Sequence, residues 1–267
     1  MIEEQIIKCK NCKTELNGCY CHNCGEKTVD EKDFSIKSIL NQSLEAITSL
    51  DSKIFKTFVA LLIKPGKLTV EFVSGRRKSY MQPFQVFVIA NLFFFFFLTS
   101  SDIFRNPSKW FFQDAEIAER VNEISAEKNI TPKELAKIYD YESGSLAKSA
   151  ILIMVPFLGL VMWLVNFSKK YLYGKHLIAA VHLFSFLLFF MVLLSFVLKF
   201  FPNPNKLHVQ IPVFSAIFVY LIIVQKRFYL DRIFVSIIKS TIETISILII
   251  LFAYRDFISK VSFLLIQ

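Results

Sequence analysis

Long apolar stretches are the feature of this sequence that most restricts what it can fold into. Of the 267 residues, 54% are hydrophobic and thirty are phenylalanine, which is more than a soluble domain of this size carries. Five stretches come close to the roughly 17–25 residues that an α-helix needs to cross a bilayer. They cover residues 84–100, 149–167, 177–200, 209–224 and 233–253. We therefore expect an all-α integral membrane protein with about five transmembrane helices.

Two of these stretches have unusual contents. The first contains five consecutive phenylalanines at 93–97, which would promote aggregation in water but are compatible with lipid. The fifth differs from the others in containing Lys239 and Glu243. Before the first stretch, residues 1–13 mix charged and apolar side chains, so they lack the continuous apolar core of a signal peptide.

All five cysteines lie within one sixteen-residue window near the N-terminus. Four of them form two Cys-x-x-Cys pairs with eight residues between the pairs, a spacing typical of a structural zinc site with four thiolate ligands. The predicted ligands are Cys9, Cys12, Cys21 and Cys24. We predict that residues 1–28 form a zinc ribbon around one Zn²⁺, with Cys19 outside the coordination sphere.

Basic residues flank the predicted spans unequally. Eleven lysines and arginines lie on the side of the N-terminus and seven on the other side. Because Lys and Arg in short loops are retained in the cytoplasm, we predict a cytoplasmic N-terminus and, with an odd number of spans, an external C-terminus. A reducing cytoplasm would keep the cysteines available as thiolates. In the reverse orientation, two disulfides with Cys19 left over are the alternative.

Residues 29–82 connect the predicted ribbon to the first span and carry an apolar stripe. Its members recur every three or four positions, as on one face of a helix. They are Ile36, Leu40, Leu44, Ile47, Leu50, Ile54, Phe58 and Leu61. Because lysines lie off the stripe, the segment can lie in the cytoplasmic headgroup layer, or it can pack on the protein or on a second copy. Pro65 and Gly66 end the pattern.

The net charge of +9 suggests nucleic-acid binding, but its distribution argues against a nucleic-acid partner. Residues 1–28 contain four lysines and four glutamates, so the predicted ribbon lacks a basic surface for phosphates. The excess lies beside the first span, above all in Arg76, Arg77 and Lys78. We expect these three to fix the topology; they could also contact anionic membrane lipid, at about 1 kcal/mol per basic side chain.

The segment 101–148 between the first two spans is too long and too polar to be a simple turn. It predicts two short helices outside the membrane. The second begins at Thr131, with Pro132 in the first turn and Glu134 placed to complete a capping box. We expect this segment to be a structural lid on the transmembrane domain, residues 83–267.

Several short motifs occur in an order that is shared with a known family. They are Asn11-Cys12, Tyr20-Cys21-His22-Asn23-Cys24-Gly25-Glu26, Lys64-Pro65-Gly66-Lys67, Gly75-Arg76-Arg77-Lys78-Ser79-Tyr80 and Pro83-Phe84. In these motifs the chain resembles the bacterial membrane family of domain of unknown function 3667. The resemblance implies an N-terminal zinc ribbon joined to a multi-span region of the bacterial inner membrane, without an established activity. Cys19, and Glu26 where glutamine is common, depart from the family's pattern.

No catalytic signature is present in the sequence, which lacks G-x-S-x-G, H-E-x-x-H, Walker and dinucleotide motifs. We therefore expect a non-enzymatic protein whose ribbon is an interaction or assembly module for a protein partner or a second copy. The alternative is a transporter or channel for a small solute or ion, lined by polar residues within the spans. These residues are Asn91, His182, Lys239 and Glu243. Their convergence on one cavity would favour transport.

Two of these polar positions have simpler structural explanations. A lone histidine such as His182 commonly makes a hydrogen bond between packed helices. Lys239 and Glu243 are four residues apart and thus share one face of a helix, where they could neutralise each other as an ion pair. Burial of either group in its neutral form is the alternative.

Overall fold

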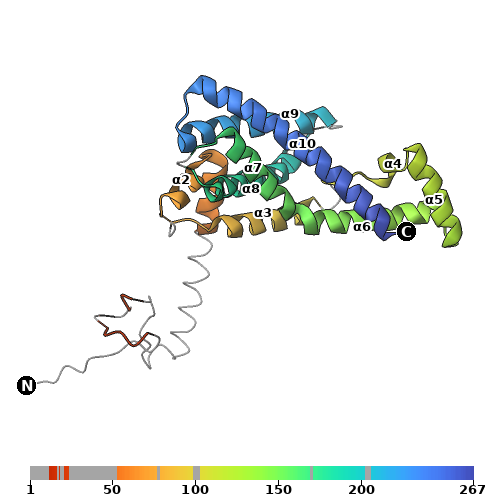
Figure 1. Ribbon diagram of the computed structural model, residues 1–267, viewed down its shortest axis with the longest axis horizontal. Helices are drawn as coiled ribbons and strands as arrows, with labels where there is room; N and C mark the ends of the chain where they lie inside the picture. Colours follow the sequence, from red (N-terminus) through yellow and green to blue (C-terminus); the bar gives the residue numbers. More distant parts are fainter. Residues whose placement is uncertain are drawn as a thin grey trace, which may run out of the picture. The chain divides into compact units, whose positions relative to one another are not determined.

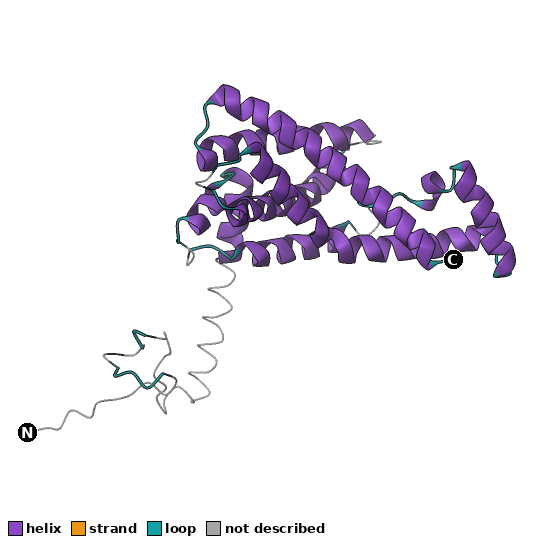
Figure 2. Ribbon diagram, in the orientation of Figure 1, coloured by secondary structure: helices purple, strands orange, loops and turns teal. Residues whose placement is uncertain are grey.

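The computed structural model describes residues 12–16, 18, 21–23, 53–76, 79–98, 103–168, 171–201 and 206–267. The chain divides into two compact units, Met1–Ser52 and Lys53–Gln267. Within the second unit, every regular element of the described residues is a helix, as Figure 2 shows. The predicted all-α class is confirmed for this unit.

Four helices in the described part of the chain are long and apolar enough to cross a membrane. They are Pro132–Val165, α8 (Tyr173–Leu198), His208–Tyr229 and α10 (Ile233–Leu265). The shortest has 22 residues and is about 33 Å long at 1.5 Å per residue, which matches a hydrocarbon core of about 30 Å. Each overlaps one of the last four predicted spans, so the described helices could cross a membrane several times, in line with the expected multi-pass architecture.

Two of these spans are built from consecutive helical pieces. Helix α6 (Pro132–Ala150) continues through a short 3₁₀ turn, η2 (Ile151–Ile153), into α7 (Met154–Val165). Helix α9 (Lys206–Val224) widens at its end into a π-helical turn, η3 (Gln225–Tyr229). The predicted boundary between external loop and second span therefore falls inside one continuous helix.

The first predicted span is shorter than expected. Helix α3 (Pro83–Phe97) has 15 residues and is about 22 Å long, which is less than a hydrocarbon core of about 30 Å. Its start is fixed by Pro83 in the first turn and by Gln85 Oε1, which accepts from the backbone N–H of Gln82 at 3.2 Å. It packs beside α8, and the two helices run in the same direction because the residue numbers of their paired rings rise together. The ring pairs are Phe87–Phe184, Phe93–Phe189 and Phe97–Phe196.

The described part of the predicted amphipathic segment packs against the bundle. It is helical over 53–63 and again in α2 (Lys67–Val73). Its buried residues before the break are Thr57, Phe58, Ala60 and Leu61. The ring of Phe58 lies 4.6 Å from that of Phe189 on α8. This part of the segment therefore follows the packing alternative, whereas the earlier stripe residues at 36–50 lie outside the described residues.

Gly66 separates these two helical pieces, as predicted. Its φ of 75° lies in the left-handed region that favours glycine. A Cβ at this position would lie 3.4 Å from the Cα of Val224 in α9, so the bend also allows close approach of the two backbones. Arg227 Nη1 donates to the carbonyl oxygen of Pro65 at 2.6 Å and holds the bend in place.

The predicted lid is a small helical subassembly with a core of its own. It consists of α4 (Ser108–Phe111), α5 (Ala115–Glu127), the first half of α6 and the C-terminal end of α10, which lie together in Figure 1. Its buried residues are Val121, Ile124, Leu135, Tyr139, Phe263 and Ile266. The predicted capping box is confirmed, since Thr131 Oγ1 accepts from Glu134 N–H and Glu134 Oε2 accepts from Thr131 N–H.

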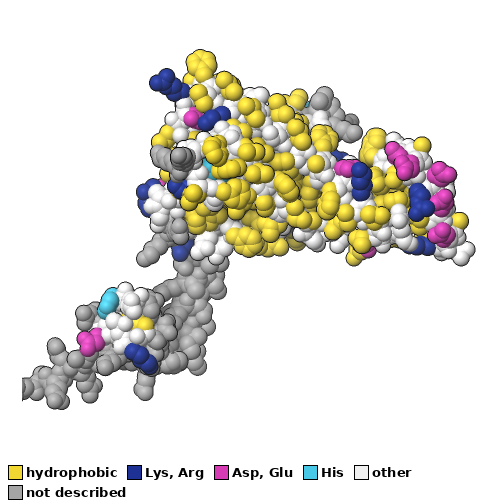
Figure 3. Space-filling model, viewed as in Figure 1, with side chains coloured by type: hydrophobic (Ala, Val, Ile, Leu, Met, Phe, Trp, Pro, Cys, Tyr) yellow, Lys and Arg dark blue, Asp and Glu magenta, His cyan; other side chains and the backbone are white. Residues whose placement is uncertain are grey.

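The surface of the second unit matches a membrane environment. On the face drawn in Figure 3, charged side chains gather at the two ends of this unit and apolar side chains cover the region between them. Large apolar residues are widely exposed in this unit; Phe96 is 76% and Phe234 79% exposed. A surface of this kind would be unfavourable in water but is suited to lipid.

Candidate functional site

Five polar residues meet beside the first third of α10, and we call them the Glu243 cluster. Asn166 caps the C-terminus of α7, and Gln225 opens the π-helical turn η3. Asp231 lies in the turn before α10, and Lys239 and Glu243 lie within that helix. Apart from Asp231 and Lys239, which are partly buried, the members are buried. The cluster therefore joins three spans through polar side chains in apolar surroundings.

A continuous series of hydrogen bonds connects the five residues of the cluster. Lys239 Nζ lies 2.7 Å from Asp231 Oδ2 and donates to Asn166 Oδ1 at 3.0 Å. Asn166 Nδ2 in turn donates to Glu243 Oε1 at 3.0 Å. Gln225 Nε2 donates to the same oxygen of Glu243 at 2.8 Å. Asn166 thus bridges the two residues that the sequence singled out on α10.

The ion pair in this cluster differs from the expected one. Lys239 and Glu243 do share a helix face, but the carboxylate that pairs with Lys239 is Asp231. The physical reason is the tight turn before α10: Leu230 adopts a left-handed backbone with φ 63°, and Asp231 N–H donates to the carbonyl of Gln225. This turn returns Asp231 to the side of α10 where Lys239 can reach it.

The other two predicted polar residues lie elsewhere in the bundle. His182 on α8 is buried, and its Nδ1 lies 2.9 Å from Thr69 Oγ1 on α2, which confirms the expected hydrogen bond between packed helices. Asn91 is on α3, and its Oδ1 has no partner among the described residues. The four predicted residues therefore occupy three separate places instead of one cavity.

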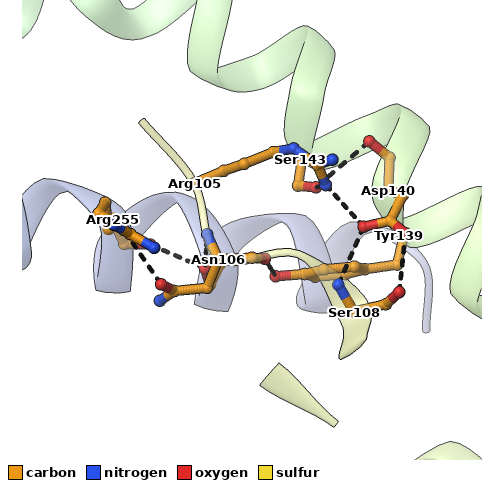
Figure 4. Close-up of polar contacts among 8 residues, drawn as sticks. Arg105, Asn106, Ser108, Tyr139, Asp140, Ser143 and Arg255 are labelled. Carbon is orange, nitrogen blue, oxygen red and sulfur yellow. Dashed lines mark hydrogen bonds and ion pairs between the residues drawn. The ribbon is translucent and has the colours of Figure 1, made fainter. Parts of the chain in front are cut away.

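A second polar cluster lies where the lid meets α10, and Figure 4 shows its contacts. We call it the Asp140 cluster; its members are Arg105, Asn106, Ser108, Tyr139, Asp140, Ser143 and Arg255. Asp140 Oδ1 accepts from Arg105 Nη1 at 2.6 Å and from the backbone N–H of Ser108 at 2.9 Å. Asp140 Oδ2 accepts from Ser108 Oγ at 2.7 Å. Both oxygens of this carboxylate are therefore satisfied.

The remaining contacts of the Asp140 cluster attach the connection after α3 to α10. Asn106 Oδ1 accepts from Arg255 Nε at 3.1 Å, and the Asn106 carbonyl accepts from Tyr139 Oη at 2.9 Å. A cavity of about 350 Å³ adjoins the cluster between Asp140 and Lys148. We interpret this cluster as the polar anchor of the lid.

The N-terminal unit brings together one cysteine from each predicted pair. Cys12 Sγ and Cys21 Sγ lie 3.5 Å apart, and Cys21 is buried. Cys9, Cys19 and Cys24 lie outside the described residues. The two described sulfurs come from different Cys-x-x-Cys pairs, and among the described residues no group of three or more His, Cys, Asp or Glu side chains could hold a metal ion.

The basic residues beside the first predicted span are described only in part. Arg76 Nε donates to Glu71 Oε2 on α2 at 2.6 Å, while Arg77 and Lys78 lie outside the described residues. This hydrogen bond holds the pKa of Glu71 below its ordinary value. Because the Arg76 side chain is 60% exposed, it is accessible to solvent or to lipid headgroups.

A stretch between the cysteines and the end of α3 matches a known family. Residues 51–95 fit the family model described as Protein of unknown function (DUF3667). In this stretch the chain is similar to DUF3667. The resemblance inferred from the sequence motifs is thereby confirmed over these residues. No curated protein and no solved structure matches the chain.

The DUF3667 match covers the helical segment at 53–63, α2 and most of α3. It therefore includes Thr69, the partner of His182, and the buried Oδ1 atom of Asn91. It ends before the Glu243 and Asp140 clusters begin. The similarity thus concerns the helices that pack on α8 and assigns no chemistry to either cluster.

The sequence interpretation did not include three members of the Glu243 cluster. Asn166 and Gln225 lie at the ends of apolar stretches, and Asp231 lies in a short turn. Each looks like an ordinary solvent-facing polar residue when only its neighbours in sequence are considered. The only signal that could have suggested these three residues is their position: each is a polar residue near the end of a span, where it could contact Lys239 or Glu243.

Proposed function

We infer that this chain is a non-enzymatic, multi-pass protein of the bacterial cytoplasmic membrane with an N-terminal zinc ribbon that serves interaction or assembly. The observation that supports the ribbon is the 3.5 Å separation of Cys12 Sγ and Cys21 Sγ. Two thiolates at about 2.3 Å from one tetrahedral zinc lie roughly 3.7 Å apart, whereas disulfide sulfurs lie about 2.05 Å apart. The observed separation is close to the first value.

The placement of the polar residues favours assembly over transport. A solute path through the spans needs polar side chains that face one continuous cavity. His182 is engaged by Thr69, and Asn91 lies on a different helix from the Glu243 cluster. Transport of a small solute or ion remains the alternative function, and it would have to use the Glu243 cluster alone.

The orientation that we propose puts the ribbon and Arg76 in the cytoplasm. Arg76, with Arg77 and Lys78, would then face the anionic leaflet of the membrane. An impermeant thiol reagent tests this orientation on intact cells. We expect it to label a cysteine introduced at the exposed Ala126 on α5 and to spare one introduced at the exposed Gly174 in the first turn of α8; the opposite pattern would reverse the topology.

Metal analysis of cysteine variants tests the ribbon. We expect about one zinc per chain in the purified protein, and its loss in Cys12→Ser and Cys21→Ser, because a structural site needs all four ligands. Cys19→Ser is the matched control and should keep its zinc. Loss of zinc from the Cys19 variant would overturn the ligand assignment.

The proposed role in assembly predicts a second result. If the ribbon mediates association, Cys12→Ser should shift the membrane-extracted protein to a smaller complex on native electrophoresis while membrane insertion is retained. A complex of unchanged size in a variant that has lost its zinc would contradict the assembly function but not the zinc site.

A further inference from the structure

The carboxyl group of Glu243 is buried and only half satisfied. Its side chain is 1% exposed. Oε1 accepts two amide hydrogen bonds, from Asn166 and from Gln225. Oε2 has no partner in the described part of the protein. The same is true of Oε1 of Gln225, which is fully buried. The two unsatisfied atoms are thus both acceptors, and they belong to two side chains already joined by one hydrogen bond.

The charged groups around Glu243 leave its carboxyl group without a dedicated cation. On α10 the facing group is Lys239, whose ammonium is engaged by Asp231 and by Asn166 Oδ1. From the turn before α10 comes the negative charge of Asp231. From η3 comes the hydroxyl of Tyr229, which is hydrogen bonded to His176 on α8. Lys239 and Asp231 neutralise each other, so an ionised Glu243 would be an excess negative charge.

Protonation of Glu243 would remove both problems, the charge without a counter-ion and the unsatisfied acceptor atoms. Burial of a charge without a paired counter-ion is strongly unfavourable, and burial of unsatisfied acceptors adds to the cost. A neutral carboxylic acid has one acceptor oxygen and one O–H donor, which complement the N–H donor and carbonyl acceptor of a primary amide. One proton on Oε2 would therefore supply the donor that Gln225 Oε1 lacks.

We propose that Glu243 is a proton-binding site, in which Oε2 carries a proton and donates it to Oε1 of Gln225. Together with the Gln225 Nε2 bond to Glu243 Oε1, this makes a two-point carboxylic acid–amide pair between α10 and the π-helical turn η3. The proton is taken up from water and is released to water, so no other bond is formed or broken. This site is independent of the proposed ribbon.

Release of the proton has a structural consequence. It places a negative charge beside Asp231 and removes the donor to Gln225. Lys239 is one helical turn from Glu243 and already linked to it through Asn166, so it is the cation placed to compensate the new charge by leaving Asp231. Proton release is therefore coupled to the contacts that join α7, η3 and α10.

Infrared spectroscopy of the purified full-length protein in lipid nanodiscs tests this proposal. The spectrum of wild type minus Glu243→Gln at neutral pH should contain the carbonyl-stretch band of a protonated carboxylic acid. Asp256→Asn is the matched control, because Asp256 is an exposed carboxylate of the same helix, paired with Lys260. Its difference spectrum should contain the bands of an ionised carboxylate and lack the acid band. Absence of the acid band from the Glu243 spectrum would overturn the proposal.

A second measurement uses the shape of the Glu243→Gln side chain. The introduced amide would accept through its oxygen and donate through its nitrogen, which reproduces the hydrogen bonds of the protonated acid. We therefore expect this variant to fold and to have a melting temperature that depends less on pH than that of wild type. Wild type should become less stable as pH rises, because its folded state holds one more proton than its unfolded state. Failure of Glu243→Gln to fold, or an equal pH dependence of the two proteins, would contradict the proton site.

Discussion

The Asp140 and Glu243 clusters both pack against α10, yet they accommodate a carboxyl group in different ways. Asp140 has a guanidinium partner, a backbone N–H and a hydroxyl, and both of its oxygens are satisfied. Glu243 has only two amide donors, both on one oxygen. The Asp140 side chain is 36% exposed, whereas Glu243 is 1% exposed. The comparison indicates that Asp140, beside an arginine and partly in solvent, stays ionised. Glu243, which is buried and contacted only by amide donors, favours the protonated form.

The length of α10 explains why one helix contributes to both settings. Its 33 residues extend about 50 Å, which exceeds a hydrocarbon core of about 30 Å. In its first third only the face with Ser236, Ser240 and Glu243 is buried, while its last turns pack on the lid through Phe263. The sequence of this helix is therefore mostly apolar around the buried Glu243 and more polar around Arg255.

Removal of the charge at Asp140 should have the largest effect. In Asp140→Asn the guanidinium of Arg105, whose side chain is only 15% exposed, loses its 2.6 Å ion pair with this carboxylate. We expect the free energy of unfolding to fall by about 2 kcal/mol, less than for a fully buried pair because Asp140 is partly exposed. Glu243→Gln should cost less than about 1 kcal/mol, since an amide repeats the hydrogen bonds of the protonated acid. Chemical unfolding in detergent micelles measures both losses.

Asp256→Asn provides the baseline for this comparison. The pair that Asp256 forms with Lys260 is exposed on both sides, so its loss should change the free energy of unfolding by less than about 0.5 kcal/mol. Equal losses for Asp140→Asn and Glu243→Gln would mean that the two carboxyl groups have the same charge state, and the contrast between the clusters would fail.

A double-mutant cycle can identify the ion pair within the Glu243 cluster. Lys239→Met and Asp231→Asn should each be destabilising, and their coupling energy should be about 1 kcal/mol because the pair is half-buried at 2.7 Å. The cycle of Lys239 with Glu243 should give a smaller coupling, since Asn166 lies between them. Reversal of both α10 charges, Lys239→Glu with Glu243→Lys, should therefore fail to restore expression. Recovery by that reversal would instead identify Glu243 as the partner of Lys239.

Hydropathy and local end signals predicted much of this fold. Four apolar stretches became helices of membrane-spanning length, and the Thr131 capping box and the Pro65-Gly66 break formed as expected. These features depend on residues that are close in sequence. The length of α3 did not follow in the same way, because the apolar run that includes five phenylalanines continues past the helix end at Phe97.

The Glu243 cluster shows where prediction from sequence stops. Residues Lys239 and Glu243 were recognised because charges within an apolar stretch are unusual. Their partners come from the end of α7, from a π-helical turn and from a left-handed turn. Which polar groups meet there is decided by the packing of α7, α9 and α10, and no local pattern contains that information.

The pair of Glu71 with the exposed Arg76 should have the smallest effect, and it serves as a surface reference for the two clusters. Its pKa is lowered by the hydrogen bond from Arg76, with further contributions from the charges of Arg76, Lys67 and Lys56. A lowered pKa in the folded state adds stability above the ordinary pKa of glutamate, and this stability is lost as pH falls through the lowered value. Because Arg76 is largely exposed, the pair should make only a small contribution at neutral pH.

The comparison of wild type with Arg76→Gln measures this contribution. Thermal unfolding should show wild type slightly more stable at neutral pH, with the difference vanishing in acid, where Glu71 is protonated in both proteins. Added salt should reduce the difference as well, because an exposed pair is screened. A difference that persists in acid would show that Arg76 stabilises α2 by packing instead of by its charge. In that case Glu71 could no longer serve as the surface reference, and Asp256 would have to replace it.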